Sequence, residues 1–98
     1  MRKLTPKEAE IINKLVTLAK LKIDTKNLLV RPLNDGGMGS LALGENYDKR
    51  MFGKQAAEFI FKDLDDTLIS AALNLDLQGN LYELDLWKVD FSPTQVLQ

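Results

Sequence analysis

The stretch over residues 68–91 constrains the fold more than any other part of the sequence. An apolar run over residues 68–75 leads into residues 76–80, whose Gly-Asn pair can adopt the positive φ angles of a tight turn. Residues 81–91 then alternate apolar and polar side chains with the period of a half-buried strand. The stretch therefore predicts a long antiparallel hairpin.

The N-terminal region carries the pattern of an amphipathic helix. Thr5 and Glu8 have the spacing of a capping box, and Pro6 suits the first helical position. Apolar residues follow at helical spacing over residues 11–19, with charged residues outside that stripe. We expect one helix from about residue 5 to residue 21, with its apolar side against the core.

Three further strands are expected between the helix and the hairpin. The first, over residues 28–33, contains Pro32, which cannot donate a backbone hydrogen bond, so this strand should lie at a sheet edge or bend there. A turn at residues 34–37 leads into the second strand, over residues 38–44. Side chains over residues 55–63 again alternate between two faces, which predicts the third strand.

This order of elements predicts an α+β fold. One N-terminal helix packs on an antiparallel β-meander of about five strands, and residues 1–98 form a single domain. The helix should cover one face of the sheet. The other face is not cleanly polar, since Ile60 and Ala72 would point there, as would Trp87 and Val89 under strict alternation. We therefore expect the loop at residues 45–53, the C-terminal tail or a second subunit to cover part of it.

Composition excludes several classes of chemistry. The chain has no Cys and no His, so it has no disulfides, no sulfur-based metal sites and none of the commonest general bases. No apolar run approaches the roughly 20 residues that span a bilayer. The N-terminus lacks the apolar segment of a secretory signal. We therefore expect a cytoplasmic protein without a membrane partner.

The net charge of −1 conceals an asymmetry. Residues 1–32 carry eight Lys and Arg against three Asp and Glu, a net +5, and residues 33–98 carry five against eleven, a net −6. Either the basic helix lies across an acidic sheet, or an acidic surface is presented to a basic partner. Nucleic-acid binding is disfavoured, because the basic residues lack interleaved aromatics and the chain has no excess positive charge.

Two loops could bind a small ligand or an ion, and each has a simpler interpretation. Residues 35–40, Asp-Gly-Gly-Met-Gly-Ser, could bring backbone N–H groups to an anion, but they lack the Lys of a P-loop and precede a strand. Asp63, Asp65 and Asp66 could bind Mg²⁺ or Ca²⁺, but the glycine and distal Glu of an EF-hand are missing. We expect residues 35–40 to form a hairpin turn and the three aspartates to lie in a solvated turn. No cofactor and no tightly bound metal is expected.

The returning strand of the hairpin holds the remaining candidates. Glu83 and Asp85 share one face and could form an acid–base pair, although a chain of this size leaves little room for a cleft. Strict alternation places Trp87 on that same face, whereas a bulge near Leu86 would return Trp87 to the core. We favour the outer face, where Ile60 also lies.

A resemblance adds to these arguments. The loop at residues 35–40, Asp76 and Gly79 in the turn, and residues 83–93 (Glu-Leu-Asp-Leu-Trp-Lys-Val-Asp-Phe-Ser-Pro) are similar to a family of small bacterial proteins of uncharacterised function. The resemblance runs over nearly the whole chain. It implies a stand-alone cytoplasmic domain and brings no activity, cofactor or catalytic residue. In size and class, small acidic α+β proteins of this kind also resemble immunity proteins, which neutralise toxins.

The preferred hypothesis is a non-enzymatic interaction module, immunity-like, that presents an acidic sheet face to a protein partner. Its binding residues would be Glu83, Asp85 and Trp87, with Asp35 and Asp90 as further candidates. A second copy of the chain is another candidate partner. The alternative is a small-ligand or metal-dependent enzyme built on residues 35–40 with Glu83 and Asp85; no catalytic residue is assigned under the preferred hypothesis.

Overall fold

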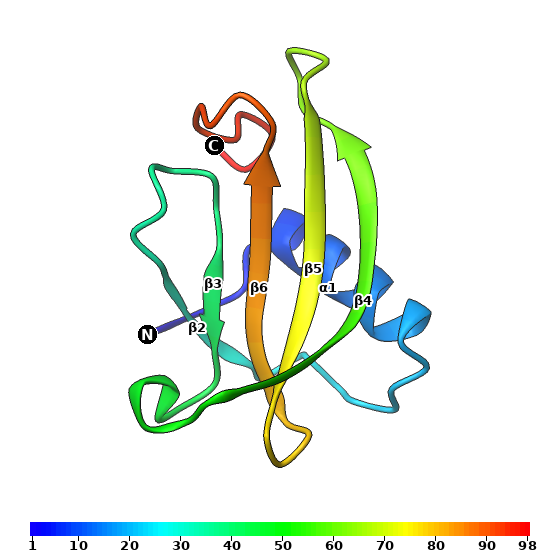
Figure 1. Ribbon diagram of the computed structural model, residues 1–98, viewed down its shortest axis with the longest axis vertical. Coiled ribbons are helices and arrows are strands. Elements are labelled where there is room, and N and C mark those ends of the chain that lie inside the picture. Colours follow the sequence, from blue (N-terminus) through cyan, green and yellow to red (C-terminus); the bar gives the residue numbers. More distant parts are fainter.

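The computed structural model describes residues 1–98 as one helix and a curved antiparallel sheet of six strands (Figure 1). The α+β class is therefore confirmed. In chain order the elements are β1 (Arg2–Lys3), α1 (Pro6–Leu18), β2 (Leu29–Pro32), β3 (Leu41–Leu43), the 3-10 turn η1 (Tyr47–Lys49), β4 (Phe52–Lys62), β5 (Leu68–Asp76) and β6 (Leu81–Lys88).

The strands follow the order β1-β2-β3-β6-β5-β4, which corrects the predicted meander of about five strands. The missed strand, β1, has only two residues, both exposed, and so carries no alternation to detect. β3 pairs with β6 and not with β4. In Figure 1 the chain leaves the lower end of β3 through η1, and the first part of β4 then crosses the lower ends of β6 and β5 to the far edge of the sheet.

The capping box forms as its spacing predicts. The backbone N–H of Glu8 donates to Oγ1 of Thr5 at 3.2 Å, and the backbone N–H of Thr5 donates to Oε1 of Glu8 at 2.9 Å. The helix ends at Leu18, before the predicted residue 21, because Lys20 adopts a positive φ of 57°. At 13 residues, α1 is too short to cross a membrane.

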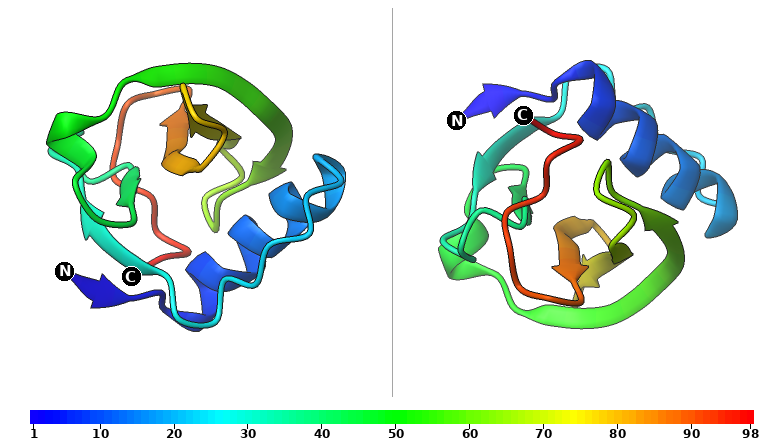
Figure 2. Two further views of the ribbon diagram at one scale, coloured as in Figure 1. Left: turned by 90° about the horizontal axis from the view of Figure 1, so that it is seen from below. Right: turned by 90° about the horizontal axis from the view of Figure 1, so that it is seen from above.

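The core lies between the concave face of the sheet and α1. In Figure 2 the sheet curls around the interior and the helix lies across the open side, in contact with β4 and β5. Burying each Leu or Ile side chain contributes about 1.5–3 kcal/mol. The buried cluster comprises Ile11, Ile12, Leu15, Val16, Val30, Leu41, Leu43, Ile69, Ala71, Leu73, Leu75, Leu81, Leu84 and Leu86.

The predicted hairpin is confirmed, and its register decides which side chains reach the outer, convex face. β5 and β6 pair from Ile69 opposite Lys88 to Leu75 opposite Leu81. The irregularity lies between Asn74 and Leu75 and not near Leu86, the position that would have turned Trp87 inward. Alternation therefore continues unbroken to the end of β6.

Candidate functional site

The outer face of β6 carries the three residues on which the sequence argument centred. Glu83, Asp85 and Trp87 point outward, while Leu84 and Leu86 between them are buried. Because the register is regular, each has a fixed cross-strand neighbour on β5: Asn74 beside Glu83, Ala72 beside Asp85 and Ser70 beside Trp87. β4 continues these rows, with Glu58 beside Ala72 and Ile60 beside Ser70.

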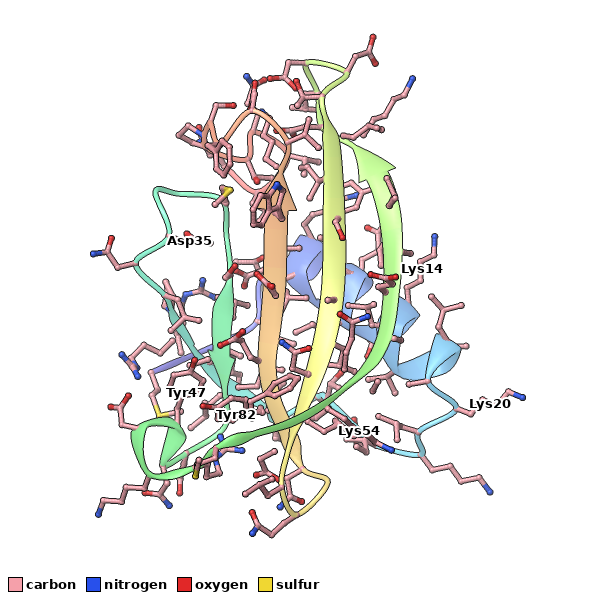
Figure 3. All side chains as sticks on the ribbon, in the orientation of Figure 1. Lys14, Lys20, Asp35, Tyr47, Lys54 and Tyr82 are labelled. Atoms are coloured by element: carbon pink, nitrogen blue, oxygen red, sulfur yellow. The ribbon has the colours of Figure 1, made fainter.

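One end of this face is covered by the segment at residues 45–53, one of the covers that the sequence led us to expect. The ring of Tyr47 stacks on Tyr82, with centroids 4.7 Å apart, and the two lie together in Figure 3. The Tyr47 hydroxyl donates a hydrogen bond to Oε2 of Glu83. Burial and this carboxylate raise the pKa of Tyr47, so the phenol stays protonated as a donor. Glu83 is thus occupied within the chain.

Arg50 fixes the covering segment in place. Its guanidinium donates to Oδ2 of Asp76 at 3.1 Å, to the carbonyl of Leu81 at 2.8 Å and to the carbonyl of Leu43. Asp76 in turn accepts from the backbone N–H of Asn80, the main reason why its pKa is lowered. This network ties together the β5–β6 turn, the end of β3 and the start of β4. The side chains of Arg50 and Asp76 therefore have a structural role.

The other end of the outer face is open. Five large apolar side chains are 44 to 66% exposed there: Ile60, Leu68, Trp87, Val89 and Phe91. We call these five residues the open patch. The Trp87 and Phe91 rings lie 5.2 Å apart, and the backbone N–H of Val89 donates to the carbonyl of Leu68. Ile60 lies in the same row as Trp87, with Ser70 between them. The sequence argument found Trp87 and Ile60 by alternation but did not place Leu68 and Phe91 beside them.

Carboxylates border the open patch. Asp85 and Glu58, both exposed, lie in the row next to that of Trp87 and Ile60. Oγ of Ser40 lies 3.4 Å from Oδ1 of Asp85. Its shorter hydrogen bond, at 2.9 Å, is the one that it accepts from the backbone N–H of Leu86 in β6. Asp85 is therefore free to meet a partner, unlike Glu83.

Asp35 does not join this surface. Its carboxylate accepts the backbone N–H of Ser40 at 2.9 Å and that of Gly39 at 3.4 Å. Burial opposes ionisation, yet these hydrogen bonds hold the pKa of Asp35 below its ordinary value. The loop's own carboxylate thus occupies the N–H groups that an external anion would need, and Figure 3 shows Asp35 apart from Tyr47 and Tyr82.

Asp90 also has a local partner. Its Oδ1 accepts from Oγ of Ser92 at 2.7 Å and from the Ser92 backbone N–H at 3.0 Å, and these bonds lower the pKa of Asp90. The arrangement is an Asx turn that reverses the chain after β6. It also positions Phe91, whose φ of 62° turns the ring toward Trp87.

The surface hollows lie elsewhere. One of about 390 Å³ lies between β1, α1 and residues 23–26, and one of about 150 Å³ lies between α1 and β4. No residue of the open patch lines any hollow. The patch is therefore flat, a shape suited to a macromolecule more than to a small ligand, which needs concavity.

The model of one protein family, described as a domain of unknown function (DUF6984), matches residues 1–98. The chain belongs to this family. No curated protein and no solved structure matches the chain. Membership in DUF6984 assigns no activity.

Sequence reasoning named Asp63 and Asp65 but missed Lys88, the residue that both of them bind. Lys88 follows Leu84 and Leu86 on the inner face and is fully buried, with Nζ 2.7 Å from Oδ2 of Asp63 and 2.8 Å from Oδ2 of Asp65. We expected the aspartates to form a solvated turn; instead Asp63 is buried. The alternation in β6 could have predicted this cluster. It places Lys88 on the inner face, and a buried lysine needs a buried counter-charge.

Asp63 also holds the C-terminal segment. It accepts backbone N–H groups from Gln95 at 2.7 Å and Val96 at 2.8 Å. Burial opposes ionisation, but Lys88 and these N–H groups lower the pKa of Asp63 from 3.8 to about 2. The cluster ties the β4–β5 turn, the end of β6 and the chain end together, with one lysine between two carboxylates and backbone N–H groups as their other donors.

Proposed function

We propose that this protein is a non-enzymatic interaction module that binds a protein partner through the open patch. The partner would present an apolar contact surface flanked by Lys or Arg side chains. The observation that carries this proposal is the exposure of Trp87, packed on Phe91 at the centre of contiguous apolar side chains on a flat face.

The apolar part of the patch supports binding. Soluble proteins seldom expose a contiguous group of large apolar side chains unless a partner covers it. Trp is also prominent among the few residues that dominate binding energy at interfaces. Trp87 is half exposed, and the regular strands β5 and β6 hold it rigidly, so little conformational entropy would be lost on binding.

The charge of the border supports a basic partner. Glu58 and Asp85 are exposed beside the patch, and one positive residue, Lys62, lies opposite Leu68. Complementary charges at an interface mainly raise the association rate and exclude wrong partners. An immunity-like role, in which this face blocks a basic toxin, is one form of the proposed function.

The enzyme alternative has less to support it. The backbone N–H groups of Gly39 and Ser40 are bound to Asp35, and Glu83 is bound to Tyr47 and Asn74. An acid–base pair or an anion site would need these groups free to act on a substrate.

Affinity capture with matched baits tests the proposal. The wild-type protein, Trp87→Ala and Leu77→Ala would be compared, since Leu77 is also exposed but lies in the β5–β6 turn. A partner found by capture would then be purified and titrated. We expect Trp87→Ala to weaken binding at least about tenfold, and Leu77→Ala to leave it unchanged.

A salt series separates the two parts of the surface. Asp85→Asn should slow association at low ionic strength, with less effect at high salt. A partner that binds wild type and Trp87→Ala with equal affinity would contradict the proposal.

A further inference from the structure

The free edge of β4 is the second unpartnered feature of the molecule. β4 stands at the end of the strand order and pairs only with β5. In Figure 1 its upper half forms the right-hand border of the sheet. From Ala57 to Lys62 the pairing with β5 has no bulge, so the backbone groups along this part of the edge alternate regularly and can pair with another strand.

The hydrogen-bonding direction along this edge follows from the β4–β5 turn. The backbone N–H of Asp63 donates to the carbonyl of Thr67 at 2.9 Å, which makes these two a hydrogen-bonded pair. Such pairs alternate with non-bonded pairs along an antiparallel ladder. The N–H and C=O groups of Glu58, Ile60 and Lys62 therefore point away from β5, toward the free edge.

We propose that a second copy of this chain pairs with this edge, antiparallel, around a two-fold axis at Ile60. Ile60 would then lie opposite Ile60 of the second copy, and each pair would exchange both of its backbone hydrogen bonds. The same register sets Glu58 opposite Lys62 of the second copy, and Lys62 opposite its Glu58. Two reciprocal ion pairs thus flank a central apolar pair.

The side-chain charges favour this register over its neighbours. An axis at Glu58 would set two glutamates against each other, and an axis at Lys62 would oppose two lysines; like charges directly opposite are destabilising. Glu58 and Lys62 are both exposed, and neither has an ion pair within the chain. They are about 13 Å apart along the strand, too far to pair with each other.

The geometry of the pairing has a consequence for the outer face. A two-fold axis normal to the sheet keeps both outer faces on the same side. The row that contains Trp87, Ser70 and Ile60 would continue into its copy, with the two Trp87 residues roughly 24 Å apart along the sheet. The dimer would present two open patches to one partner surface, with Asp85 still free at the border of each and Glu58 paired with Lys62 of the second copy. This dimer does not require the function proposed above.

Sedimentation velocity with charge-reversed variants tests the pairing. Edge contacts bury little area, so the dimer should be weak and the concentrations should span about 1 µM to 1 mM. Glu58→Lys carries lysine at both positions and Lys62→Glu carries glutamate at both. Each alone should dimerise roughly tenfold more weakly or worse, because both ion pairs become repulsive.

Mixing the two variants gives the decisive comparison. In a mixed dimer every charged pair is again complementary, so an equimolar mixture should dimerise about as well as wild type. Circular dichroism would confirm that each variant is folded, and Lys49→Glu, in η1 and outside the paired segment 57–62, is the matched charge control.

Three results would overturn the proposal. They are a wild-type chain that stays monomeric over the whole range, a dimer that both single variants retain, and a mixture that fails to recover dimerisation. A dimer lost in Trp87→Ala and kept in Glu58→Lys would instead assign self-association to the open patch.

Discussion

Nζ of Lys88 lies 2.7 Å from Oδ2 of Asp63, and neither side chain is exposed to solvent. Their attraction has to offset the cost of removing both charges from water, which requires further hydrogen bonds. The carbonyl of Pro93 accepts from Lys88 at 3.2 Å, and Asp65 supplies a second carboxylate. The polar cluster thus closes one end of an otherwise apolar core.

Lys88→Met should reduce the free energy of unfolding by about 3–5 kcal/mol, because it leaves Asp63 buried without its counter-charge. The exposed Lys54→Met should change stability by no more than about 0.5 kcal/mol. Urea denaturation followed by circular dichroism measures both. Adding Asp63→Leu to Lys88→Met should recover part of the loss, as expected for coupled residues. A double variant as unstable as the two single losses combined would show that the pair is not coupled.

Stability should fall in acid through Asp63. The pKa of Asp63 is about 2 in the folded chain against an ordinary 3.8, so the unfolded state takes up the proton first as the pH falls. The stabilisation is complete at pH values well above the pKa of Asp63 in the unfolded state, and it is lost as the pH falls from about 5 to about 2. Urea midpoints at several pH values should fall less steeply in Asp63→Asn than in wild type. Equal slopes would contradict the assignment.

Local pattern was enough to predict much of the fold. The capping box, the hairpin and the outward position of Trp87 follow from residues close in sequence, and each is observed. The pairing of β3 with β6 could not be predicted, because it depends on Arg50 and Tyr47 holding the crossing segment against distant strands. Nothing in local alternation specifies such contacts.

The candidate site also depends partly on local sequence and partly on contacts between residues distant in the chain. Glu83 and Asp85 look equivalent in the sequence, yet Tyr47, far away in the chain, occupies Glu83 and leaves Asp85 exposed. Phe91 joins Trp87 only because Asp90 and Ser92 reverse the backbone after β6. A residue such as Phe91, which joins the open patch through a turn, can be assigned to the patch only when the geometry of that turn is known.

Gly39 should tolerate substitution less well than Gly36. Both have positive φ angles, so alanine strains the backbone at either position. At Gly39 the added Cβ would also lie 2.5 Å from Cδ1 of Leu97 and 3.1 Å from Cδ1 of Leu86, whereas nothing lies within 4 Å at Gly36. We expect Gly39→Ala to cost about 1–3 kcal/mol more than Gly36→Ala in thermal or urea unfolding. Equal losses would mean that the C-terminal segment does not pack on this loop.

Trp87 and Leu86 are adjacent on β6 and lie on opposite faces of the sheet, so the two substitutions compare those faces. Leu86 is 1% exposed, so Leu86→Ala should remove about 2–5 kcal/mol of stability through lost burial and the cavity left behind. Trp87 is 50% exposed and packs mainly on Phe91, so Trp87→Ala should cost no more than about 1.5 kcal/mol.

Tryptophan fluorescence provides the independent measurement. In dilute wild-type protein the emission should be red-shifted and readily quenched by acrylamide, because Trp87 is the only Trp and half of it meets water. Protected emission at every concentration, together with unfolding of Trp87→Ala, would make Trp87 a core residue. A small loss of stability in Trp87→Ala would leave this large exposed side chain without a structural role, which is what the proposed contact with a partner predicts.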